Sequence, residues 1–166
     1  MKEEYKRLRH SKDEADRKRC LELLDTYLKE NPGDAEAWYD KASCHDFIGD
    51  EREAEPCYRK CFTLGWKNLP LNEQKSFFVG FGSTLRNNLK FDESVKVLEE
   101  GIKNFPDVPA LKVFLAFSYS SKKMDLKASE ILFSVVPDIA KQGLDGYERA
   151  IQWYSENLLN HPERRL

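Results

Sequence analysis

Large apolar or small side chains recur every three or four positions on both sides of the Gly49-Asp50 pair, in the stretch from Trp38 to Cys61. Such spacing gathers side chains on one face of an α-helix, and a glycine commonly ends a helix. The stretch is therefore predicted to form two helices joined by a tight turn. A weaker form of the same pattern returns before and after it at an offset of about 34 residues, which is typical of a solenoid built from helical hairpins.

The stretch resembles a tetratricopeptide repeat. Its residues take the positions where that family has a large residue, a small residue, the turn glycine, an alanine, an aromatic residue and a further small residue: Trp38, Ala42, Gly49, Ala54, Tyr58 and Cys61. Three positions depart from the family pattern. Lys41 replaces the usual leucine and His45 the usual tyrosine, and Pro56 lies inside the second helix, where it is expected to remove one backbone hydrogen bond and kink the helix. The resemblance implies an all-α, right-handed solenoid of antiparallel helical hairpins.

Further copies of the pattern divide the chain. We expect a single domain over residues 1–166, made of half a repeat at about 13–34, full repeats at about 35–68, 75–108 and 109–142, and a capping helix at about 144–160. Residues 1–12 are dense in charged side chains and predict only a frayed or partial helix. The period slips in the loop 66–74, where Trp66 and Leu69 either contact a partner or, as we favour, fold back over the core.

Local signals mark several helix ends. A helix is expected to start from Asp13, and Asp34 and Asn72 are expected to cap the helices that follow them. Pro109 suits the first turn of a helix. Pro137 is expected to interrupt the helix in which it lies, because proline lacks a backbone N–H.

Composition limits the possible functions without selecting one. With 166 residues, 40% of them hydrophobic, the chain can bury one continuous core. Charged residues make up 34%, but the net charge is only -2, so bulk electrostatics favour neither nucleic acid nor another polyion as partner. No apolar run approaches the ~18 residues of a membrane span, and the chain opens on charged residues instead of a signal sequence. We expect a cytoplasmic protein that binds no membrane and keeps its four cysteines reduced.

The residues that could carry chemistry predict neither a metal site nor an enzyme. Cys44, His45, Cys57 and Cys61 are soft ligands, but an antiparallel hairpin would separate His45 and Cys61 by about 10 Å. No serine stands in a nucleophile elbow and no glycine-rich loop has the spacing of a phosphate site. We expect no catalytic residue, no metal and no cofactor. The basic segment 6–19 also contains acids and lacks interleaved aromatic residues, so no nucleic acid is expected either.

The resemblance implies a function in binding. In this family the first helices of successive hairpins line a concave groove that holds a peptide or helix of a partner protein. The register assigns to the partner-binding groove Tyr39, Ser43, Phe47, Val79, Ser83, Arg86, Asn87, Val113, Phe117 and Ser120. It also turns toward the groove Glu36, Asp46, Ser76, Ala110 and Ser121. Apolar members would anchor the partner, while Arg86 and Asn87 would fix its direction. We therefore expect a non-catalytic protein-interaction module or scaffold.

One subclass of the family is disfavoured. Repeat co-chaperones hold the acidic carboxyl end of heat-shock chaperones with lysine, asparagine and arginine side chains at five groove positions. The corresponding residues of this chain are Tyr39, Ser43, Gly80, Ala110 and Phe114. None of them carries the positive charge that a two-carboxylate clamp needs.

Self-association is the alternative. The expected last helix has apolar residues on more than one face, and a simple cap does not need them. A possible homodimer interface would contain Tyr147, Ile151, Trp153, Tyr154 and Leu158. A concentration-dependent dimer that the Ile151→Glu, Trp153→Glu variant abolishes would support this alternative.

Overall fold

The computed structural model describes residues 1–9 and 11–142 of the 166-residue chain. These residues form α-helices and one short 3-10 helix, and no strand occurs among them. The elements in order are α1 (Lys2–Leu8), α2 (Glu14–Glu30), α3 (Ala35–Phe47), α4 (Glu51–Gly65), η1 (Trp66–Asn68), α5 (Leu71–Asn87), α6 (Phe91–Asn104), α7 (Pro109–Ser121) and α8 (Asp125–Gln142).

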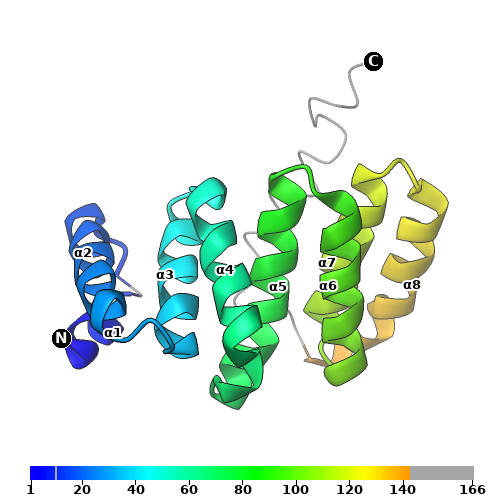
Figure 1. Cartoon of the computed structure of the whole chain (residues 1–166). Coiled ribbons are helices and arrows are strands. Elements are labelled where there is room, and N and C mark those ends of the chain that lie inside the picture. The colour runs from blue at the N-terminus through cyan, green and yellow to red at the C-terminus, as the bar shows by residue number, and fades with distance from the viewer. Residues whose placement is uncertain (10, 143–166) are drawn as a thin grey trace.

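The helices stand side by side in a row, as Figure 1 shows. α3 packs mainly on α4, α5 on α6 and α7 on α8, so that each of these pairs is a hairpin. Hairpins also stack, because α3 touches α5 and α5 touches α7. The predicted all-α solenoid of helical hairpins is therefore confirmed. Its division into the stated repeats stays a prediction, and the expected capping helix 144–160 lies outside the described residues.

Helix beginnings follow local signals at most positions. The side chain of Asp13 accepts hydrogen bonds from the first-turn amides of α2, and that of Asp34 accepts one from the Ala37 amide in α3. Pro109 is the first residue of α7, where its missing N–H costs no helical hydrogen bond. These ends are determined by side chains within four residues of the helix they begin.

Two expected helix boundaries are wrong. Asn72 does not cap α5, because the helix already begins at Leu71 and the carbonyl of Pro70 accepts its first hydrogen bonds. Pro137 does not interrupt α8, which continues to Gln142. A proline inside a helix removes one backbone hydrogen bond. The packing of α8 against α7 supports the remainder of the helix.

The three hairpin turns share one geometry. Gly49, Leu89 and Lys123 adopt left-handed backbone conformations, with φ of 77°, 62° and 60°. In each turn the following amide bonds back to a helix carbonyl: Asp50 to His45 at 2.9 Å, Lys90 to Leu85 at 2.8 Å and Met124 to Tyr119 at 3.0 Å. This bond closes a Schellman motif, which satisfies a carbonyl left free at the helix end. Only the first of the three turns was recognisable from a glycine.

Aromatic rings fill the core between the first and second full hairpins. Phe77 of α5 is completely buried, and its ring lies within 5.4–6.3 Å of five other ring centroids: Tyr39, Tyr58, Phe62, Phe78 and Phe81. Within the second full hairpin, α5 and α6 approach each other closely at Gly82. A Cβ placed on Gly82 would lie 2.5 Å from Cγ of Leu98. The core thus combines large rings with positions that only glycine fits.

The loop after α4 folds back over the core. Trp66 is 7% exposed and its ring contacts Phe78 edge-on, with 4.7 Å between centroids. Leu69 is 3% exposed. The interpretation that we favoured for this loop is therefore confirmed, and these two side chains fill the joint between α4 and α5.

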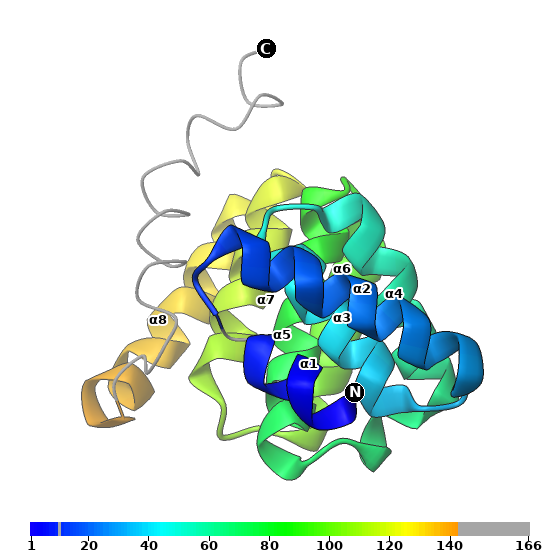
Figure 2. The ribbon, with the colours of Figure 1, turned by 90° about the vertical axis from the view of Figure 1, so that its left-hand side faces the viewer.

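The N-terminal segment is more ordered than its sequence predicts. It forms α1, which packs on α2 with Tyr5 fully buried and lies in front of α3 in the end-on view of Figure 2. One face of α1 is basic. It meets carboxylates of α3 and α5: Lys2 pairs with Asp34 at 3.0 Å, Lys6 with Asp40 at 3.0 Å, and Arg9 with both Asp40 and Glu73. These ion pairs attach α1 to the first full hairpin.

Candidate functional site

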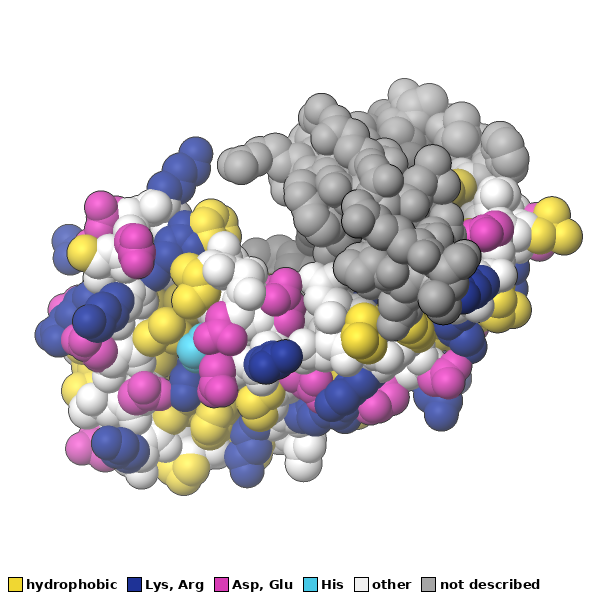
Figure 3. Space-filling view, turned by 90° about the horizontal axis from the view of Figure 1, so that it is seen from above, with side chains coloured by type: hydrophobic (Ala, Val, Ile, Leu, Met, Phe, Trp, Pro, Cys, Tyr) yellow, Lys and Arg dark blue, Asp and Glu magenta, His cyan; other side chains and the backbone are white. Residues whose placement is uncertain are grey.

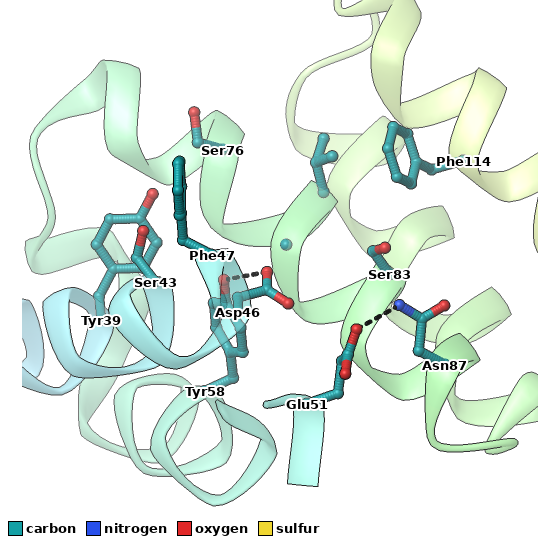
Figure 4. A pocket seen from close by; sticks show the side chains of 12 residues that line it. Tyr39, Ser43, Asp46, Phe47, Glu51, Tyr58, Ser76, Ser83, Asn87 and Phe114 are labelled. Atoms are coloured by element: carbon teal, nitrogen blue, oxygen red, sulfur yellow. Dashed lines mark hydrogen bonds between the residues drawn. The ribbon is translucent and has the colours of Figure 1, made fainter. Parts of the chain in front are cut away.

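A cavity of about 390 Å³ opens between the hairpins. Three successive first helices, α3, α5 and α7, line it together with the start and middle of α4. The lining side chains, drawn in Figure 4, are Tyr39, Ser43, Asp46, Phe47, Glu51, Tyr58, Ser76, Val79, Gly80, Ser83, Asn87 and Phe114. Pockets of this size and mixed character are typical of sites that hold one large side chain or a small ligand.

Six of the ten residues assigned to the groove line this cavity. They are Tyr39, Ser43, Phe47, Val79, Ser83 and Asn87. Of the five further residues that the register turned toward the groove, Asp46 and Ser76 lie there as well, whereas Glu36, Ala110 and Ser121 do not line the cavity. The structure thus brings together groove positions of α3 and α5, although their role in binding a partner remains a prediction.

The other four assigned residues are buried and do not line the cavity. Arg86 donates to Oγ of Ser121 at 2.8 Å and so joins α5 to α7. Ser120 donates to Asp125 at 2.9 Å, and the Phe117 ring packs edge-on against Phe114. Val113, at 2% exposure, is also buried in α7.

Four lining residues were not among those that the register assigned to the groove or turned toward it: Glu51, Tyr58, Gly80 and Phe114. Glu51 is the first residue of α4, so the tight turn after α3 returns it to the end of the groove. Tyr58 reaches the cavity from the same helix, and Phe114 reaches it from α7. The turn at Gly49 was a usable signal for Glu51, whereas the positions of Tyr58 and Phe114 depend on how the hairpins stack.

Two carboxylates lie on one side of the cavity. Asp46 accepts hydrogen bonds from the Thr84 hydroxyl at 3.0 Å and the Tyr58 hydroxyl at 3.1 Å. Glu51 accepts one from the Asn87 amide at 3.0 Å. Burial raises the pKa of Asp46 to about 6 although both hydroxyls act to lower it, and the negative charge of Glu51 adds to the rise. Ionised Asp46 is therefore costly for the folded protein.

We expect Asp46→Asn to stabilise the protein at pH 7 by about 1–2 kcal/mol. The folded-state pKa of Asp46 is above its unfolded value, so its ionisation costs folding stability as pH rises from about 4 to about 6. The cost is full at pH 7 and absent below pH 4, so the advantage of asparagine should vanish in acid. Urea unfolding followed by circular dichroism across this pH range measures it.

Asp107→Asn is the matched control, because Asp107 is exposed in the turn before α7. It should leave the free energy of unfolding within about 0.5 kcal/mol of the wild type. A lower stability of Asp46→Asn than of the wild type at pH 7 would contradict the argument.

A second hollow lies on the other side of Phe47. Its lining consists of Lys12, Glu14, Arg17, Lys18, Leu21, Phe47 and Ile48. Phe47 is 61% exposed, and the guanidinium of Arg17 lies 3.3 Å above its ring centroid, a cation-π arrangement. Phe47 therefore separates a cavity with carboxylates from a hollow with a basic rim.

The described surface as a whole is mixed in charge. In Figure 3, which views the molecule from above, acidic and basic side chains alternate over the coloured face. Many of them are paired across neighbouring helices, as Arg59 is with Glu93 at 2.7 Å. Selectivity for a charged partner would consequently come from a local site and not from the surface potential.

The cysteines are buried free thiols. Burial raises the pKa of Cys57 to about 11 and that of Cys61 to about 12, so both stay protonated and weakly nucleophilic at neutral pH. Cys20 and Cys44 lie with their sulfur atoms 3.4 Å apart between α2 and α3. Within residues 1–9 and 11–142, no three histidine, cysteine or acidic side chains are grouped as a metal site would require.

The possible dimer interface falls on Tyr147, Ile151, Trp153, Tyr154 and Leu158, which lie outside the described residues. Self-association therefore stays a prediction. In the part of the chain that is described, none of the helices combines the length and the apolar character needed to cross a membrane.

Comparisons with known proteins support the architecture. The model of a family described as "Tetratrico peptide repeat" matches residues 35–158. Among solved structures, the crystal structure of MamA protein is similar, with a TM-score of 0.65 and 15% identity over 78% of this chain and 68% of that one. At this identity the likeness shows a shared fold alone. A comparison with curated proteins gives no significant match.

Proposed function

Because this chain belongs to the tetratricopeptide repeat family, we propose that it is a non-catalytic module that binds a segment of a partner protein in the groove along α3, α5 and α7. Repeats of this family generally mediate protein–protein interaction. The proposal assigns the binding to one place in the chain, the cavity between the first two full hairpins.

The observation that carries the proposal is the composition of that cavity. Its walls are aromatic and apolar at Tyr39, Phe47, Val79 and Phe114, while hydroxyl, amide and carboxylate groups lie among them. Apolar anchors that exclude water, combined with a few polar groups that fix orientation, are what a peptide groove requires. Phe47, largely exposed at the edge of the cavity, offers a partner apolar area without any rearrangement of the core.

Peptide selection tests the proposal. A phage-displayed library of random peptides is selected against the full chain, and the best binder is measured by isothermal titration calorimetry. Phe47→Ala should weaken binding about tenfold, which corresponds to about 1.4 kcal/mol of lost contact at an exposed anchor. Ser83→Trp, which places a large ring in the cavity, should weaken it further.

Leu126→Ala is the matched control. Leu126 is the most exposed large apolar side chain of the described residues, at 78%, and it lies on α8 away from the cavity. Equal losses in Phe47→Ala and Leu126→Ala, or unchanged affinity in Ser83→Trp, would show that the peptide binds elsewhere.

A further inference from the structure

The carboxylates of the cavity differ from the buried carboxylates elsewhere in the described residues. Those others lie against cations: Asp40 against Lys6 and Arg9, and Glu55 against Arg59 and Lys90. Asp46 and Glu51 have hydrogen-bond donors, but no lysine or arginine of residues 1–9 or 11–142 lies within ion-pair distance of either. The cavity lining likewise contains no basic side chain. Both carboxylates are partly buried, and burial raises the pKa of Asp46, so the charge of Asp46 is costly without a cation. Such a cost is commonly kept where a ligand offsets it.

The walls of the cavity suit the stem of a long side chain. Figure 4 shows Phe47 and Phe114 on either side of the space, with Asp46 and Glu51 lying lower between them. Val79 and Gly80 of α5 also line the cavity. Lysine and arginine side chains match this arrangement. Each has an apolar stem that packs on hydrophobic surface and a cationic head that needs a carboxylate or water.

We propose that this cavity receives a basic side chain, arginine in preference to lysine, from an extended or helical segment of the partner protein. This inference rests on the proposed function and specifies the partner that the groove takes. The stem would lie between Phe47 and Phe114, and the head would reach the oxygens of Asp46 and Glu51. Arginine is preferred because its planar guanidinium can donate to two carboxylates at once and stack on an aromatic ring.

The same features reject other partners. An acidic side chain would face two like charges in a partly desolvated site, and their repulsion disfavours its binding. A purely apolar side chain would bury Asp46 and Glu51 further without neutralising them. Discrimination by charge is therefore the property that separates this cavity from a simple hydrophobic groove.

Four synthetic peptide libraries test the inference on the full chain. Each has random residues around one fixed central position, which is arginine, lysine, citrulline or glutamate. Citrulline has the shape of arginine without its charge, so it is the matched probe. By fluorescence anisotropy the arginine library should bind at least about tenfold more tightly than the citrulline library, with lysine between them and glutamate weakest.

Two variants locate the preference. Asp46→Asn and Glu51→Gln keep the size of these side chains and one of their two acceptor oxygens, and they remove the charge. Each should reduce the advantage of arginine over citrulline several-fold. Asp107→Asn, an exposed carboxylate outside the cavity, should preserve the full advantage.

The outcomes separate this inference from the proposed function. Equal affinity for arginine and citrulline, with binding still lost in Ser83→Trp, would overturn the inference and leave the interaction module standing. If none of the libraries binds, the inference about a basic side chain is also overturned. The phage selection would then show whether the chain binds peptides at all. A peptide with the sequence of residues 143–166, which contains Arg149, Arg164 and Arg165, is the last arm. If it displaces the arginine library from the wild type, the occupant is this chain's own segment and not a partner.

Discussion

Replacing Phe77 by alanine should lower the free energy of unfolding by about 4 kcal/mol, the range found for large aromatic side chains removed from a core. Phe77 is completely buried and its ring contacts rings from α3, α4 and α5. The truncation would remove these contacts and leave a void that several helices cannot close together. Urea unfolding monitored by circular dichroism measures the loss.

The control is the same substitution at an exposed ring. Phe47→Ala removes an equal volume from a side chain that is 61% exposed, so it should change stability by about 0.5 kcal/mol or less. A small effect of Phe77→Ala, similar to that of Phe47→Ala, would mean that the joint between the first two full hairpins contributes little to stability.

Removing the charge of Arg9 should destabilise the protein by about 3 kcal/mol, because it breaks a buried ion pair on one side only. Arg9 connects α1 to α3 and α5 through Asp40 and Glu73. Asp40 is fully buried, and burial already raises its pKa. In Arg9→Met the apolar part of the side chain is largely kept. The loss measured by urea unfolding therefore reports mainly on Glu73, which loses its ion pair with Arg9, and on Asp40, which is left with Lys6.

A double-mutant cycle distinguishes this account from a simple loss of packing. Arg9→Met combined with Asp40→Asn should recover part of the stability, since one of the two carboxylates that pair with Arg9 then carries no charge, while Glu73 still does. Arg7→Met is the control, because Arg7 is exposed on the same helix and should change little. Additive losses in the double variant would show that Arg9 and Asp40 do not interact energetically.

The charge of Asp46 is expected to lower the stability of the fold and to strengthen the binding of a basic side chain. The Asp46→Asn variant is expected to gain stability at pH 7, whereas the same variant is expected to lose its preference for arginine peptides. Phe77 and Arg9 behave differently, because each contributes to the fold and neither lines the cavity. Functional positions commonly hold residues that lower the stability of the fold and support binding, as we expect of Asp46.

The sequence by itself determined the helices and their order. Asp13, Asp34 and Pro109 act within one helical turn of their own positions, so their effect could be predicted without any tertiary contact. The repeating spacing of apolar and small residues specified which faces are buried, and from this the stacked hairpins followed. The resemblance then identified most of the residues of α3 and α5 that line the cavity.

Only the tertiary structure decided features that depend on residues far apart in the chain. The carboxylates that hold Lys2, Lys6 and Arg9 lie about 30 to 64 positions further on, so the charged N-terminal segment gave no local sign that α1 would be ordered. The meeting of Asp46 with Thr84 likewise joins α3 to α5. Local periodicity fixes a helix and its buried face, but the distance between two side chains on different hairpins depends on how closely those hairpins pack.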